Sequence, residues 1–82
     1  MRNWTSLCDG VEIIGLKLRD SPSGLAALVK IEIIDSEKIE PPREKWIPYS
    51  QIEAGVYNKN TNEYKIIVST WLGRKIHEEL SE

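Results

Sequence analysis

The strongest indication of the fold is the stretch Lys45-Trp46-Ile47-Pro48-Tyr49-Ser50-Gln51-Ile52. Its bulky and β-branched residues favour a β-strand, but Pro48 lies in the middle and cannot donate a hydrogen bond to a neighbouring strand. We therefore expect a strand from Glu44 to about Tyr49 that lies at a sheet edge or bends at Pro48. Ser50–Ile52 is expected to form a short turn of tight helix or an abrupt bend. Such bends are typical of small, strongly curved β domains.

A first hairpin is predicted upstream of this strand. Apolar residues alternate along Val11–Arg19, and the alternation changes phase near Gly15, which indicates a β-bulge there. Asp20–Gly24 is dense in turn-forming residues. A second strand follows from about Leu25 to Ile34, and Asp35–Arg43 is predicted to be a polar, acidic connection.

A second hairpin and a helix are predicted downstream. The hairpin runs from a strand at about Glu53–Tyr57, through a tip rich in asparagine, to a strand at about Glu63–Ser69. Asparagine tolerates the left-handed backbone conformations that such a tip needs. Ser69 or Thr70 is expected to cap a C-terminal helix that ends near Leu80. Its apolar stripe recurs every four residues, at Leu72, Ile76 and Leu80.

Together these elements predict one domain of the mainly β (α+β) class. We expect a small, partly open five-stranded β-barrel or curled antiparallel sheet over 11–69, with a C-terminal helix over 70–80. Residues 1–10, which include Trp4 and Cys8, are expected to form an N-terminal extension.

The composition narrows the classes of function. The chain has 82 residues, 11 of them Lys or Arg and 13 Asp or Glu, and this balance argues against a dedicated nucleic-acid binder. The single cysteine excludes an internal disulfide and a cysteine-based zinc site, which fits a reducing, cytoplasmic compartment. No apolar run is long enough to span a bilayer, so we expect no membrane association.

No constellation of catalytic residues is recognisable in the sequence. His77 is the only histidine, no second metal ligand follows it at helical spacing, and the five glycines are dispersed. Catalytic triads and phosphate-binding loops are therefore not predicted. We expect a protein that is not an enzyme and that needs no cofactor or metal.

The aromatic residues have two interpretations. The chain contains three tryptophans, three tyrosines and no phenylalanine, so Trp46 and Trp71 are predicted to supply bulk to the core. The alternative is an interaction surface, because exposed aromatic residues beside arginine often anchor protein interfaces.

The chain resembles a group of small uncharacterised proteins common in bacteriophage and prophage genomes. The resemblance covers about residues 25 to 75 and rests on the Trp-aliphatic-Pro-x-Ser-Gln step at Trp46–Gln51 and on the strand that enters a helix through Trp71-Leu72. The acidic segment Asp35–Glu44 and the N-terminal extension depart from the group's pattern. The resemblance implies a phage or mobile-element origin, without a defined activity.

The leading hypothesis is a non-enzymatic protein that binds and modulates a host or phage protein, such as a bacterial defence complex. Acidic residues would supply charge complementarity and aromatic residues the anchor. The predicted interface residues are Glu37, Glu40, Glu44, Trp46 and Tyr49. Such a protein is expected to be a monomer or a small homo-oligomer.

The alternative hypothesis is a single-stranded nucleic-acid-binding accessory protein of phage replication or recombination, with bases stacked on aromatic residues. The residues predicted for it are Arg43, Lys45, Tyr57, Lys59 and Lys65. A third and weaker hypothesis is sequestration of a small ligand between protomers of an oligomer.

Overall fold

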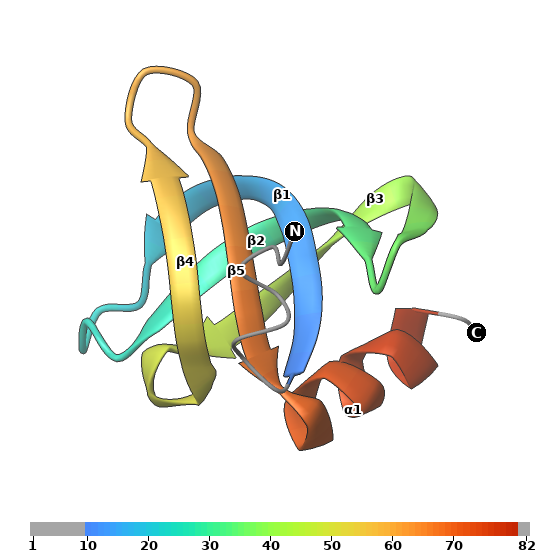
Figure 1. The fold of residues 1–82 in the computed structure, drawn as a ribbon. Coiled ribbons are helices and arrows are strands. Elements are labelled where there is room, and N and C mark those ends of the chain that lie inside the picture. The colour runs from blue at the N-terminus through green and yellow to red at the C-terminus, as the bar shows by residue number, and fades with distance from the viewer. Residues whose placement is uncertain (1–9, 81–82) are drawn as a thin grey trace, which may run out of the picture.

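The computed structural model describes residues 10–80, which form a curled antiparallel sheet followed by a helix (Figure 1). Within these residues the elements are β1 (Gly10–Asp20), β2 (Ala26–Ile34), β3 (Glu37–Pro48), β4 (Ile52–Asn58), β5 (Glu63–Ser69) and α1 (Thr70–Leu80). The sheet has five strands in the order β3-β2-β1-β5-β4, and all neighbours are antiparallel. The predicted fold class is confirmed, as a curled sheet that is not closed into a barrel.

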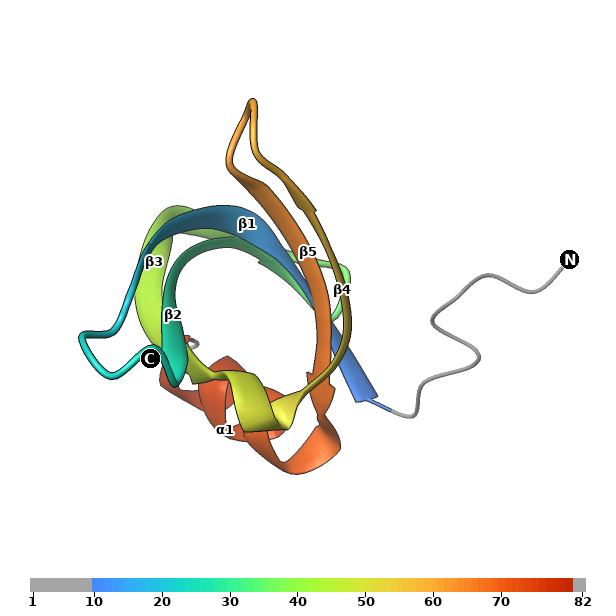
Figure 2. The ribbon, with the colours of Figure 1, turned by 90° about the vertical axis from the view of Figure 1, so that its left-hand side faces the viewer.

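Figure 2 shows how strongly the sheet curls, with α1 lying across its lower side. We call the face toward the enclosed core the inner face and the opposite one the outer face. The register between β1 and β2 shifts between Ile14 and Gly15, but the extra residue is Glu32 of β2, because Ile14 is opposite Ile33 and Gly15 is opposite Ile31. The predicted change of phase along β1 at Gly15 is therefore wrong, since Ile13, Gly15 and Lys17 all lie on the inner face. A Cβ atom on Gly15 would lie 2.1 Å from the carbonyl oxygen of Lys30, so this close approach requires glycine.

The second half of the fold also follows local signals in the sequence. A 3₁₀-helix at Tyr49–Gln51 follows Pro48 and joins β3 to β4, as expected. Asn62 is the last residue of the turn between β4 and β5. Its φ of 62° is the left-handed conformation expected for this tip.

The prediction of an acidic connection over Asp35–Arg43 is wrong. Asp35 and Ser36 have φ angles of 50° and 66° and form a two-residue turn, after which β3 begins at Glu37. Two left-handed residues match the twist of a hairpin and let β3 start immediately. Residues 39–42 then loop out of the ladder, because Ile33 is opposite Lys38 and Ile31 is opposite Arg43.

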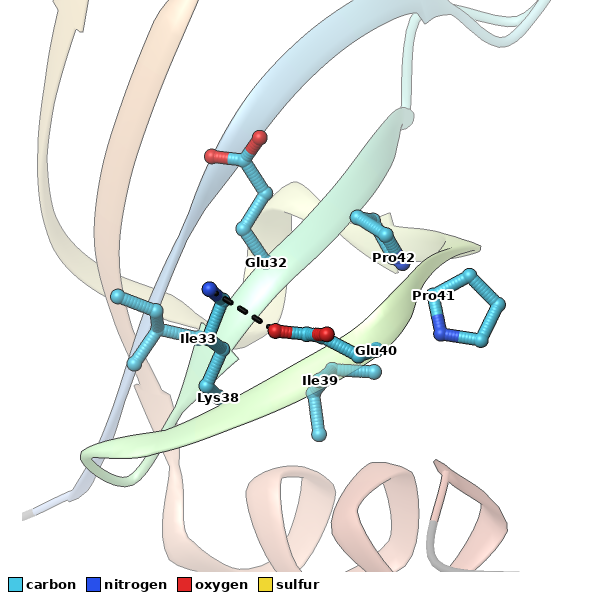
Figure 3. Close-up of a pocket in the computed structure, with 7 residues that line it drawn as sticks. All are labelled: Glu32, Ile33, Lys38, Ile39, Glu40, Pro41 and Pro42. Atoms are coloured by element: carbon cyan, nitrogen blue, oxygen red, sulfur yellow. Dashed lines mark ion pairs between the residues drawn. The ribbon is translucent and has the colours of Figure 1, made fainter.

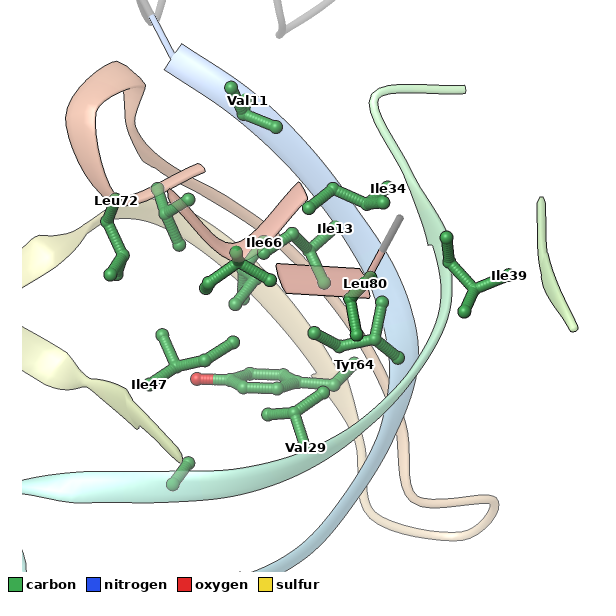
Figure 4. Close-up of a cluster of buried hydrophobic side chains, with 14 residues drawn as sticks. Val11, Ile13, Val29, Ile34, Ile39, Ile47, Tyr64, Ile66, Leu72 and Leu80 are labelled. Atoms are coloured by element: carbon green, nitrogen blue, oxygen red, sulfur yellow. The ribbon is translucent and has the colours of Figure 1, made fainter. Parts of the chain in front are cut away.

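The core is almost entirely aliphatic (Figure 4). Its buried members are Val11, Ile13, Ala27, Val29, Ile31, Ile34, Ile39, Ile47, Tyr64, Ile66, Val68, Leu72, Ile76 and Leu80. The prediction that Trp46 and Trp71 belong to it is wrong, because their exposed fractions are 44% and 66%. Each tryptophan precedes a buried residue, Ile47 or Leu72, and therefore points to another side of its strand or helix.

The helix α1 begins and packs as predicted. The Ser69 hydroxyl accepts a hydrogen bond of 3.3 Å from the Leu72 backbone N–H, which is the geometry of an N-terminal cap. A Cβ atom on Gly73 would lie 2.3 Å from Cβ of Val11. This glycine therefore lets the helix approach β1 closely.

Trp4 and Cys8 lie outside the described residues. Among residues 10–80, no helix has the length and apolar character needed to cross a membrane.

The contact between Gly73 and Val11 and the helix propensity of alanine predict opposite effects of Gly73→Ala on stability. Alanine favours an isolated helix over glycine by about 1 kcal/mol. In this protein we expect Gly73→Ala to lower the free energy of unfolding by about 1–3 kcal/mol, because the added methyl group overpacks the contact with β1. Urea unfolding of the variant measures the change. Arg74→Ala, at an exposed position of the same helix, should stay within about 0.5 kcal/mol, and a stabilised Gly73→Ala protein would contradict the prediction.

Candidate functional site

An extra residue in β1 creates a surface on the outer face. Lys17 is opposite Val29 of β2, whereas Arg19 is opposite Leu28, so Leu18 is left without a partner in the ladder. Val29 points into the core, which places Lys17 on the inner face and Arg19 on the outer face. The bulge therefore sets Leu18 and Arg19 next to each other on the outer face.

Trp46 completes this surface from β3. It is opposite Leu28 on the other side of β2, and the guanidinium carbon of Arg19 lies 5.6 Å from the centre of the Trp46 ring system. Leu28 lies between them and is only 8% exposed, although it is not a member of the core cluster. We call Leu18, Arg19, Leu28 and Trp46 the Arg19–Trp46 patch.

The chemistry of this patch suits a protein partner. Tryptophan and arginine are enriched among residues that dominate binding energy, and a guanidinium stacked on an indole keeps its N–H groups free to donate. Leu18, 45% exposed, adds apolar area beside them. The cation–π contact restricts both long side chains, which lowers the conformational entropy that they lose on binding.

Of the acidic residues predicted for an interface, one lies beside the patch. Glu44 is two residues before Trp46 on β3 and is opposite Lys30, which places it on the outer face. Glu37 contacts Nε2 of His77 on α1. Glu40 forms an ion pair of 2.9 Å with Lys38. The structure therefore brings together Glu44 and Trp46, while Glu37 and Glu40 are engaged elsewhere on β3.

Tyr49 and Tyr57, which were predicted for two different sites, meet in one cluster. The Nζ atom of Lys17 lies 5.6 Å from the Tyr49 ring centre and 5.1 Å from that of Tyr57. It also lies 3.2 Å from a carboxylate oxygen of Asp20, to which the Tyr49 hydroxyl donates a hydrogen bond. Tyr57 packs edge-to-face on Tyr64 with a centroid distance of 5.8 Å. We call these five residues the Lys17 cluster.

The Lys17 cluster shifts the pKa values of three of its members. The Tyr49 hydroxyl, and after it the Lys17 ammonium, lower the pKa of the Asp20 carboxyl. The contact with Tyr49 raises the pKa of Lys17 against a smaller opposing effect of burial. Burial raises the pKa of Tyr64. Lys17 and Asp20 therefore remain a compensated ion pair at neutral pH, which suits a structural contact between β1 and the 3₁₀-helix.

The residues predicted for nucleic acid do not form one surface. Arg43 and Lys45 alternate with Trp46 on β3 and lie on the inner face, where the Lys45 ammonium donates to the Glu79 carboxylate of α1 at 3.0 Å. Lys65 lies on the outer face, 3.6 Å from a carboxylate oxygen of Glu12. Lys59 lies in the tip of the second hairpin, and Tyr57 belongs to the Lys17 cluster.

An open depression of about 700 Å³ lies where β3 loops away from β2 (Figure 3). It is lined by Glu32, Ile33, Lys38, Ile39, Glu40, Pro41 and Pro42. Its Lys38 and Glu40 side chains pair with each other, as the dashed line shows. The depression is formed within one protomer, whereas the ligand hypothesis expected a pocket between protomers.

In the part of the chain that the structure describes, no group of three or more His, Cys, Asp or Glu side chains is arranged to hold a metal ion.

Several residues of the two clusters were not predicted from the sequence. The sequence predicts a regular strand through Leu18 and Arg19, because Leu16-Lys17-Leu18-Arg19 alternates without a visible break. The extra residue is detectable only from the register with β2. The sequence predicts Lys17 to lie within this strand and Asp20 in the turn that follows it, and only the tertiary structure shows that both meet Tyr49.

Comparison of the chain with protein-family models, curated proteins and solved structures gives no match.

The Lys17 cluster predicts a pH-dependent effect of Asp20→Asn. Because the folded protein lowers the pKa of Asp20 below its usual value of 3.8, the stabilisation from this carboxylate is present above that pH. It is lost as the pH falls through the lower folded pKa. We therefore expect Asp20→Asn to destabilise the protein at neutral pH and to differ less from wild type near pH 3. Urea unfolding at both pH values measures the difference in the free energy of unfolding between Asp20→Asn and wild type. Glu78→Gln, at an exposed position of α1, is the control, and a difference between Asp20→Asn and wild type that does not change with pH would contradict the assignment.

Proposed function

We propose that this chain is a non-enzymatic interaction protein of phage or mobile-element origin that binds and modulates a host or phage protein. Inhibition of a bacterial defence complex is one role of this kind. The observation that carries the proposal is the Arg19–Trp46 patch, in which a tryptophan 44% exposed is stacked with an arginine on the outer face.

The position of Trp46 supports a role in binding over one in stability. Trp46 is not a member of the buried core, whereas Ile47 on the same strand is fully buried. Exposing an indole to water forgoes the stabilisation that its burial would give. A partner that covers Trp46 and Leu18 would recover that free energy at the interface.

The charges around the patch indicate what the partner presents. Arg19 would donate to a carboxylate or to backbone carbonyl groups, because its guanidinium is planar and has several fixed N–H donors. Glu44, beside Trp46 on the outer face, would face a basic residue of the partner. The proposed partner surface is therefore an apolar pocket with mixed charges at its rim.

The proposed phage or mobile-element origin rests on the resemblance described above. Its Trp-aliphatic-Pro-x-Ser-Gln step includes Trp46 of the patch.

Affinity capture with a matched pair of tryptophan variants tests the proposal. The immobilised full chain is expected to retain one stoichiometric protein from host lysate, and nuclease treatment should not release it. Trp46→Ala should weaken binding of that protein by about thirtyfold, as for a hot-spot residue. Trp71→Ala removes an equally large exposed side chain, from α1, and should change the Kd by less than about threefold.

Two outcomes would count against the proposal. Recovery of nucleic acid alone, lost on nuclease treatment, would favour the nucleic-acid hypothesis. Equal effects of the two tryptophan variants would exclude the Arg19–Trp46 patch as the binding surface.

A further inference from the structure

The two edges of the sheet differ in how they are protected. The β3 edge contains Pro41, Pro42 and Pro48 and loops out of the ladder over 39–42. Prolines and bulges are the usual means of preventing another strand from adding to an edge. β4 (Ile52–Asn58) contains no proline and is hydrogen-bonded only to β5. Its one register shift lies near the start of the strand, at Glu53, and its pairing is regular from Ala54 to Asn58. Its other side therefore presents backbone N–H and C=O groups that no strand of the described chain uses.

The side chains of β4 leave this edge accessible. Val56 is opposite Lys65, which places it on the outer face, and it is 65% exposed. Glu53 is the only charged residue of the strand, and Lys59 follows directly after its end. Both are exposed, and within residues 10–80 neither forms an ion pair.

We propose that two copies of this chain associate by antiparallel pairing of their β4 strands around a twofold axis at Val56. In this register Val56 is opposite Val56 of the second copy, and Gly55 is opposite Tyr57. At each end of this pairing, Glu53 of one copy, which is the extra residue of the β4 bulge, comes near Lys59 of the other, which directly follows its strand. The pairing unites the two sheets into one continuous sheet.

The charges select this register among the possible ones. Opposite charges across two strands stabilise pairing and like charges oppose it. A shift that centres the pair on Gly55 would set Glu53 against Tyr57 and leave Lys59 without a partner. Centring on Val56 forms two Glu53–Lys59 pairs and covers the two exposed valines with each other.

The proposed dimer leaves the Arg19–Trp46 patch accessible. The patch lies on β1, β2 and β3, whereas β4 is at the opposite edge of the sheet. A dimer would therefore present two patches and would bind a multivalent partner with higher avidity. The dimer itself does not depend on the proposed function of the patch.

Sedimentation of the full-length chain over a range of concentrations tests the dimer. Wild type is expected to show a monomer–dimer equilibrium. Glu53→Lys sets two lysines near each other at both ends of the dimer contact. The repulsion between these like charges should raise the dimer Kd by about tenfold. The double variant Glu53→Lys/Lys59→Glu restores both pairs with reversed signs and should return the Kd to that of wild type. A wild-type chain that stays monomeric, or a double variant that does not recover, would overturn the proposal.

Cross-linking tests the register independently. Directly opposite residues of an antiparallel pair have Cα atoms about 4.5–5.5 Å apart, a separation that a disulfide can bridge. In a Cys8→Ser background, Val56→Cys should therefore oxidise to a covalent dimer. Leu25→Cys, 71% exposed in the turn between β1 and β2, should stay monomeric under the same conditions. Equal cross-linking of the two variants would indicate random collision and would refute the register.

Discussion

The extra residue at Leu18 determines where the polar and aromatic side chains of this protein lie. Before it, Lys17 faces the inner side of the sheet and reaches Asp20, Tyr49 and Tyr57. After it, Arg19 faces the outer side and reaches Trp46. Without the bulge, β1 would continue its alternation and Arg19 would turn toward the inner face. Both clusters therefore depend on one irregularity of backbone pairing.

Stability and recognition are separated in this fold. Burial of isoleucine, valine and leucine, with Tyr64 as the aromatic member of the core cluster, supplies the stabilisation. Lys45–Glu79, an ion pair between β3 and α1, lies at the surface, where such pairs contribute little to stability. Because the core needs neither Trp46 nor Trp71, both tryptophans remain free for contacts outside the chain.

The outer face and the β4 edge offer two different kinds of contact. The Arg19–Trp46 patch presents side chains, which suits recognition of a particular partner surface. The β4 edge presents backbone groups, which any extended strand can use, so specificity there must come from side chains such as Glu53 and Lys59. Since the two lie at opposite ends of the strand order, both contacts can be made at the same time.

The features that depend only on residues close together in the chain can be predicted from the amino-acid sequence. The tight helix after Pro48, the cap at Ser69 and the curled sheet with its C-terminal helix all follow from local patterns. The bulge predicted at Gly15 lies instead at Glu32 of the paired strand, because it depends on the register between β1 and β2. Tertiary contacts set three further features: the start of β3 at Glu37, the exposure of Trp46 and Trp71, and the contact between Arg19 and Trp46. Arg19 and Trp46 come together through the register of two separate strand pairs. A one-residue change in either register would turn one of these side chains to the other face, and nothing local to either residue specifies that register.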